Sequence, residues 1–314
     1  MNRKIPDITT LKTGIELTNR CNMRCSMCPL NTLKRPAADM SWDLVEKVAS
    51  EFRIHGLRLR WLHEMGEPLL YPRLVEAINL FPGCSLSTNC KALDEEMSEK
   101  LLKSSLERIR LCPDTIHEEI YPVIRRGGNF QQTVSNIRRF LEMSKDYDIQ
   151  VEIQKMVSKL TAEETVSQFG DFFRIADYPN ARIIEKTCEG IDTTDATELH
   201  EEFYGCFQGH PFRWFIVLAD GRVTHCCYDS DGLQIIGDLN NQTIEEIISS
   251  PRIPELIDAF RRRDWLNLPR CGECHRNARA AAVAKDRLVQ LGHRIDGILP
   301  VKKIGRRLFN RPED

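Results

Sequence analysis

Residues 13–28 read TGIELTNRCNMRCSMC, and this stretch decides the fold. Thr13 to Thr18 form a short β-type run, and Cys21, Cys25 and Cys28 follow it in the spacing C-x3-C-x2-C. Three thiolates so close together converge only on a shared metal centre or on disulfides. They are one short of the four cysteines that normally hold a [4Fe–4S] cluster, which would leave one iron open, as catalytic metal sites require.

The size and composition of the chain narrow the classes to which it can belong. Its 314 residues suggest about two domains at roughly 150 residues each. Lys and Arg number 44 against 46 Asp and Glu, and this net charge of −2 excludes a globally basic nucleic-acid binder. The longest apolar run, residues 214–219, is far shorter than the roughly twenty residues of a membrane-spanning helix. Because residues 1–7 show no secretory signal, we expect a cytoplasmic chain whose twelve cysteines serve metal or redox chemistry.

Up to about residue 190, β-type and helical segments alternate. Six strands and five helical segments follow one another without an obvious hairpin signal, which favours a parallel sheet. Six units are too few for a closed eight-stranded barrel, so we expect an α/β fold with a partial (β/α)6 barrel, although periodicity alone leaves flavodoxin-like folds open. Active-site groups then lie at the carboxyl ends of the strands. The expected strands are residues 13–18, 57–61, 84–88, 108–111, 149–157 and 181–184, and the last expected helix is residues 162–175.

The character of the sequence changes after residue 200. Residues 214–218 and 222–225 are typical of a β-hairpin with its turn at residues 219–221, and Thr243 is placed to cap a helix. We expect a barrel domain at residues 1–200, a small hairpin-plus-helix domain at 201–285 and a solvated basic tail at 286–314. Four cysteines of the second domain could together hold either a [4Fe–4S] cluster or a structural zinc ion: Cys206, Cys226, Cys271 and Cys274.

The cysteine triad directly after the first strand resembles the radical S-adenosylmethionine (SAM) superfamily. The resemblance covers nearly the whole chain, and it implies that the amino and carboxylate groups of SAM chelate the open iron. It also implies that the reduced cluster cleaves SAM to methionine and a 5′-deoxyadenosyl radical, which takes a hydrogen atom from the substrate. An electron donor such as flavodoxin or ferredoxin is implied as a partner.

Further positions match motifs of this family. Met27 stands where a family residue meets the adenine through its backbone, and residues 65–68 resemble the motif that binds the SAM amino group, with Met65 in place of a glycine. Residues 87–90 resemble a Thr-Asn-Gly motif with Cys90 in place of glycine, and residues 112–114 resemble Ser-Leu-Asp with Cys112 in place of serine. The implied SAM-binding residues are Met27, Gly66, Glu67, Pro68, Asn89 and Arg126, the last of which follows Arg125 in a loop that is expected to reach the SAM carboxylate.

The second cysteine group is similar to the SPASM and twitch auxiliary domains of the same superfamily. Cys206 is followed by fourteen residues, Gly221, four residues and Cys226, and then by the Cys271-x2-Cys274 pair. No cysteine follows Cys274, so the resemblance is to the shorter twitch domain with one auxiliary [4Fe–4S] cluster, as in the radical SAM 2-deoxy-scyllo-inosamine dehydrogenases. Cys227 could replace Cys226, but the spacing from Gly221 favours Cys226. Two clusters and SAM are therefore the expected cofactors.

The expected substrate is a small polar molecule such as a sugar or an aminocyclitol. The first strand begins at about residue 13, which leaves no room for an N-terminal peptide-recognition domain, although a peptide-modifying enzyme stays an alternative. We expect oxidation of an alcohol to a ketone. The alternative is epimerisation, in which a thiol returns a hydrogen atom, and Cys112 and Cys188 are candidates for that catalytic role. His63 and Glu64 are expected to pack in the core or lie at a solvated rim, with a place facing the pocket as the alternative. A cluster-bearing electron carrier without chemistry of its own is the competing class of function.

Overall fold

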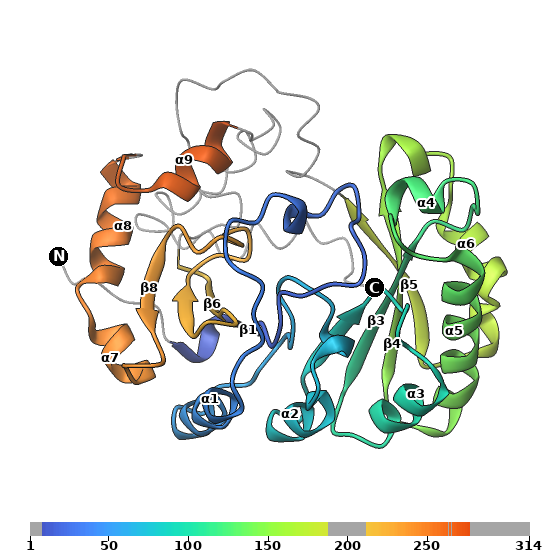
Figure 1. The fold of residues 1–314 in the computed structure, drawn as a ribbon, viewed down its shortest axis with the longest axis horizontal. Coiled ribbons are helices and arrows are strands. Elements are labelled where there is room, and N and C mark those ends of the chain that lie inside the picture. The colour runs from blue at the N-terminus through green and yellow to red at the C-terminus, as the bar shows by residue number, and fades with distance from the viewer. Residues whose placement is uncertain (1–7, 188–211, 263, 265, 277–314) are drawn as a thin grey trace, which may run out of the picture.

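A curved sheet at the centre of the fold joins both halves of the chain (Figure 1). The computed structural model describes residues 8–187, 212–262, 264 and 266–276. Cys188, Cys206 and the basic tail lie outside the described residues. The strands are β1 (Lys12–Ile15), β2 (Ser85–Thr88), β3 (Arg108–Asp114), β4 (Gln150–Val157), β5 (Ala181–Thr187), β6 (Trp214–Val217), β7 (Arg222–Thr224) and β8 (Ile235–Asp238).

The sheet consists of two four-stranded parts in the orders β1-β6-β7-β8 and β2-β3-β4-β5. Trp61 connects them through single parallel bridges to Gly14 of β1 and Ser85 of β2. The predicted strand at residues 57–61 is therefore wrong in extent, because only its last residue pairs. Its neighbours bond instead to the side chain of Thr13, whose hydroxyl donates to the carbonyl of Arg58 and accepts from the amide of Arg60.

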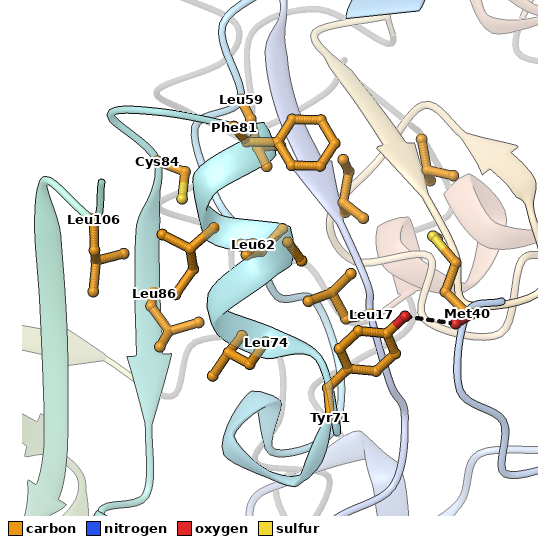
Figure 2. Packing of buried hydrophobic residues seen from close by; sticks show 14 of the residues in the cluster. Leu17, Met40, Leu59, Leu62, Tyr71, Leu74, Phe81, Cys84, Leu86 and Leu106 are labelled. Atoms are coloured by element: carbon orange, nitrogen blue, oxygen red, sulfur yellow. Dashed lines mark hydrogen bonds between the residues drawn. The ribbon is translucent and has the colours of Figure 1, made fainter. Parts of the chain in front are cut away.

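Helices cover the outer side of the parallel strands (Figure 1). The strand residues that face them are apolar and fully buried, as Ile109, Leu111 and Val151 show. Figure 2 shows the same core beneath α2, where the hydroxyl of Tyr71 donates to the carbonyl of Met40 at 2.9 Å. The helices are α1 (Trp42–Ile54), α2 (Leu74–Leu80), α3 (Glu95–Leu102), α4 (Tyr121–Ile124), α5 (Phe130–Met143), α6 (Val166–Phe173), α7 (Ile244–Ser249), α8 (Arg252–Arg262) and α9 (Pro269–Arg276).

Local capping fixes where these helices begin. The side chains of Ser41, Asp94 and Asn129 each accept a hydrogen bond from a backbone amide of the first turn of the helix that follows. The helix that the sequence predicts at residues 162–175 is shorter in the structure, where α6 spans Val166–Phe173. Its start is set at Val166 because Thr165 and Gln168 form a capping box. The α/β class with a parallel sheet is confirmed.

The C-terminal strands extend the central sheet rather than forming a sheet of their own. β6 pairs in parallel with β1, and β7 and β8 continue in antiparallel order. The hairpin predicted around residues 219–221 is confirmed, and its turn needs Gly221 because φ there is +87°. Thr243 caps α7, also as predicted. Within the described part of the chain, no helix is both long and apolar enough to cross a membrane.

Candidate functional site: the cysteine loop and the strand ends around it

The three N-terminal cysteines lie on the loop that leaves β1. Backbone amides anchor this loop to the α4–α5 connection, since Arg24 N donates to Arg126 O at 2.8 Å and Ser26 N to Ile124 O at 2.9 Å. Cys25 is buried, and Cys21 and Cys28 are half-buried. Met27 lies half-buried on the same loop. A cavity of about 520 Å³ opens beside the loop and is lined by Cys21, Asn22, Met23, Arg24, Arg126 and Gly127.

Two of the three sulfur atoms already receive hydrogen bonds. Asn89 Nδ2 lies 3.7 Å from Cys21 Sγ, and Arg125 Nη1 lies 3.5 Å from Cys25 Sγ. Burial raises the pKa of the Cys21 thiol to about 11 and raises that of Cys28 as well. Without a metal these two thiols stay protonated at neutral pH, so binding of a metal must release their protons.

The three cysteines and the N–H groups near them fit an iron–sulfur cluster. Cysteine thiolates are the usual ligands of such a cluster, and N–H donors directed at the sulfurs help to set its reduction potential. In residues 8–187, 212–262, 264 and 266–276, no three Cys, His, Asp or Glu side chains are yet grouped as the ligands of a metal ion. The loop holds the three thiols within eight residues of one another. Their side chains must turn toward a common centre to bind a cluster.

The Gly66-Glu67-Pro68 segment fastens the cysteine loop to the end of β2. Gly66 has φ +80°, and a Cβ atom there would lie 2.4 Å from the carbonyl oxygen of Thr18, immediately before the cysteine loop. The buried carboxylate of Glu67 accepts hydrogen bonds from Thr88 Oγ1 and Asn89 N, both at 2.8 Å. Pro68 then opens a short 3₁₀ helix. The predicted SAM-binding residues Gly66, Glu67, Pro68 and Asn89 thus form one contiguous structure with the cysteine loop.

Gly66→Ala is expected to unfold the protein at markedly lower urea concentration than wild type. The new methyl group meets backbone on the opposite side, so the cost exceeds the roughly 1–2 kcal/mol of a left-handed conformation alone. Gly170→Ala in α6 is the matched control, because a Cβ atom there meets nothing within 4 Å. It should be neutral or stabilising by about 0.5–1 kcal/mol. Equal urea midpoints for the two variants would contradict this reading of Gly66.

The end of β3 places polar groups beside the cysteine loop. Cys112 is buried, and its sulfur lies 3.2 Å from Ser87 Oγ on β2. Burial also raises the pKa of the Cys112 thiol. Asp114 forms an ion pair with Arg125 at 2.7 Å and accepts a hydrogen bond from Gln154 at 2.8 Å. Of the two adjacent arginines, the predicted Arg126 is exposed and lines the cavity, whereas Arg125 points inward; no local sequence signal separates them.

His63 and Glu64 lie where the second strand was expected to end. The ring of His63 packs edge-on against Trp61 with centroids 5.2 Å apart, and its buried Nδ1 has no hydrogen-bond partner within the described part of the chain. Burial lowers the pKa of His63 to about 3 and raises that of Glu64. The thiol of Cys226 lies near enough to Glu64 to raise the pKa of that carboxyl further. Glu64 and Cys226 therefore lie within electrostatic range of each other.

The structure brings two of the four C-terminal cysteines into one neighbourhood. The buried amide of Gln234 accepts a hydrogen bond from Cys271 N at 2.9 Å, which ties the start of α9 to the β7–β8 connection. A hydrogen bond from Cys227 lowers the pKa of the Cys226 thiol, and the same contact raises the pKa of Cys227. The positive charge of Arg270 lowers the pKa of Cys226 further. Cys206 and the side chain of Cys274 lie outside the described residues.

Comparison with known families decides what these features belong to. Residues 15–153 match the radical SAM superfamily. The chain carries a radical SAM domain. Residues 206–275 match the iron–sulfur cluster-binding SPASM domain. These two domains confirm [4Fe–4S] clusters and SAM as the cofactors of the chain, as its cysteine spacing predicts.

Known proteins resemble this chain in sequence over part of its length and in fold over most of it. A probable GTP 3′,8-cyclase of Archaeoglobus fulgidus is 32% identical over 139 residues, which are 43% of this chain and 46% of that protein. The chain spans about half the length of the curated relatives it matches. Native anSMEcpe with bound AdoMet superposes with a TM-score of 0.60 at 18% identity, over 92% of this chain and 98% of the other. BtrN in complex with AdoMet and 2-DOIA gives 0.51 at 15% identity, over 79% and 86%. These structures show the shared fold.

Proposed function

We propose that this chain is a radical SAM enzyme that abstracts a hydrogen atom from a carbon of a small polar substrate. Cys21, Cys25 and Cys28 would hold the catalytic [4Fe–4S] cluster. When bound there in its reduced form, the cluster supplies the cleavage of SAM to methionine and a 5′-deoxyadenosyl radical. Cys226 and Cys271, with Cys206 and Cys274, would hold the auxiliary cluster.

The observation that carries this proposal is the packing of the cysteine loop against the Gly66 turn. A Cβ atom at Gly66 would lie 2.4 Å from Thr18 O and 2.8 Å from Arg20 O, so the two segments touch backbone to backbone. The loop that follows places Cys21 in the lining of the cavity, beside Arg126 and Gly127. The protein thereby places thiolate ligands and backbone hydrogen-bonding groups around one space, as binding of SAM at a cluster requires. A bare electron carrier has no need of such a space.

Polar side chains on three adjacent strands support a small polar substrate. Ser87 and Cys112 lie near the carboxyl ends of β2 and β3, and Gln154 lies on the neighbouring strand β4. A few convergent polar groups of this kind fix the orientation of a small ligand. Two superposed structures contain a small molecule, 2-DOIA, and a peptide, Cp18Cys, as ligands of those proteins. We favour the sugar or aminocyclitol class and keep the peptide class as an arm of the test.

After hydrogen abstraction, we favour oxidation of an alcohol to a ketone. Oxidation requires an electron acceptor near the substrate, and Cys226 lies within electrostatic range of Glu64. Epimerisation requires a hydrogen-atom donor instead. Cys112 is the described candidate for that role, because its thiol faces Ser87 beside the cysteine loop. Cys188, the second candidate, stays a prediction from the sequence.

The function is tested by incubating the anaerobically reconstituted protein with SAM, a reductant and candidate sugars in heavy water. We expect 5′-deoxyadenosine to form, and the product to lack two hydrogens with no deuterium bound to carbon. Deuterium at a non-exchangeable carbon that disappears in Cys112→Ala would instead establish epimerisation. Cys84→Ala is the matched control, since Cys84 is buried at the opposite end of β2. Failure to form 5′-deoxyadenosine with or without any substrate would refute the proposal as a whole.

A nucleotide is the second candidate for the substrate. The curated relatives of this chain are named GTP 3′,8-cyclases, and the matches cover between 39% and 60% of this chain. GTP is therefore included in the same assay, with a peptide arm beside it. Conversion of GTP without conversion of any sugar would place the chain with those relatives in substrate class as well as in sequence.

A further inference from the structure

A buried ion pair stands directly behind the cysteine loop. Arg125 directs Nη1 to Cys25 Sγ at 3.5 Å and Nη2 to Asp114 Oδ2 at 2.7 Å. The side chain of Arg125 is 11% exposed, and Asp114 is fully buried. Arg125 therefore bridges the two groups, with one terminal nitrogen directed at the sulfur and the other at the carboxylate counter-ion.

The position of Asp114 is held by more than this ion pair. Its backbone has φ +68°, a left-handed conformation that costs a residue other than glycine roughly 1–2 kcal/mol. The register of β3 against β4 shifts between Leu111 and Asp114, so the strand bulges just before the carboxylate. Gln154 on β4 then donates a hydrogen bond to Asp114 Oδ1 at 2.8 Å. Backbone strain that persists because its surroundings fix it is often associated with function.

The charge at this place acts on whatever Cys25 binds. In a buried setting a unit charge a few ångströms away changes a one-electron equilibrium strongly, because little solvent screens it. Hydrogen bonds to sulfur and the net local charge are among the factors that set the reduction potential of iron–sulfur clusters. A cation facing the sulfur stabilises the reduced, more negative state. An anion behind that cation partly offsets the effect.

We propose that Arg125, held in place by Asp114, is a positioning residue that raises the reduction potential of the cluster bound by the cysteine loop. The inference rests on the proposed function, because it requires Cys25 to be a cluster ligand. Removal of Arg125 and removal of the Asp114 charge must then have opposite effects on the potential. A purely structural role would change both variants in the same direction.

The test is a redox titration of the reconstituted protein followed by electron paramagnetic resonance, in the absence of SAM. The contribution of the auxiliary cluster is taken from the Cys21/Cys25/Cys28 triple alanine variant. In Arg125→Gln we expect the ratio of reduced to oxidised cluster at a fixed potential to fall on the order of tenfold, which is about 59 mV for a one-electron couple. Asp114→Asn is expected to raise that ratio, and asparagine tolerates the left-handed backbone at this position.

Two further variants separate charge from packing. Arg125→Lys keeps the charge and should restore most of the ratio lost in Arg125→Gln. Arg24→Gln removes an exposed cation from the cysteine loop itself, where Arg24 Nη1 donates to Cys21 O at 3.0 Å. Because solvent screens this charge, the shift in reduction potential should be much smaller than in Arg125→Gln. If Arg125→Gln fails to bind a cluster, the Asp114→Asn and Arg125→Lys titrations decide the question on their own.

Several results would overturn the inference. An unchanged potential in both the Arg125 and the Asp114 variants would do so, as would shifts of the same sign. An unchanged potential together with weaker SAM binding would assign Arg125 to the ligand and not to the cluster. A wild-type protein that binds no cluster through the three cysteines would contradict the proposed function itself, and that outcome is distinguishable because it appears before any Arg125 variant is made.

Discussion

Replacing Cys21, Cys25 and Cys28 together by alanine is expected to abolish formation of 5′-deoxyadenosine. Each thiol lies on the one loop that packs against Gly66, and no other described cysteine shares that loop. Wild-type protein should hold about eight irons per chain after reconstitution, from two [4Fe–4S] clusters. The triple variant should hold about four, because the C-terminal cysteines are untouched. Iron analysis and chromatography of the reaction mixture measure both quantities.

A single cysteine variant outside the loop is the control for the triple variant, and two results would contradict the ligand assignments. Cys84→Ala removes a buried thiol remote from the loop and should keep both the iron and the activity. A triple variant that still makes 5′-deoxyadenosine above background would show the ligand assignment to be wrong. Four irons and one zinc per wild-type chain would show that the four C-terminal cysteines form a zinc site, while leaving the catalytic cluster in place.

Glu16→Ala is expected to produce the largest loss of stability of any single substitution considered. Glu16 is fully buried, and its carboxylate pairs with both terminal nitrogens of Arg35, at 2.8 and 2.9 Å. It also accepts from the backbone amides of Met65 and Ala219, so it joins β1 to two loops at the carboxyl end of the sheet. Loss of the carboxylate leaves the guanidinium buried without its partner, which costs about 3–5 kcal/mol.

Urea or thermal unfolding measures this loss of stability. Glu99→Ala is the matched control, because Glu99 pairs with Lys103 on the exposed face of α3, where solvent screens the ion pair and its loss should change the free energy of unfolding little. Glu16→Ala should also lower iron incorporation, since the loop that contains Met65 leads directly to Gly66. A free energy of unfolding within about 1 kcal/mol of wild type would contradict the role assigned to this ion pair.

The sequence by itself determined the features that depend on neighbours along the chain. The cysteine spacing at residues 21–28 and the helix cap at Thr243 each involve only a few consecutive residues. So does the hairpin turn at Gly221. Local conformation and local hydrogen bonds settle such features, and for that reason they could be predicted and agree with the structure.

Only the tertiary structure decided which distant groups meet. The sequence predicts a strand at residues 57–61. In the structure the carbonyl of Arg58 and the amide of Arg60 bond to the hydroxyl of Thr13, and Trp61 is the single residue that forms β-bridges. Arg125 and Arg126 are indistinguishable in sequence, and the bulge that turns Asp114 inward makes the first of them the buried partner of Cys25. The pairing of β6 with β1 likewise has no local signal. Such contacts depend on burial and on long-range packing, since desolvation decides which of several equivalent polar groups must be paired.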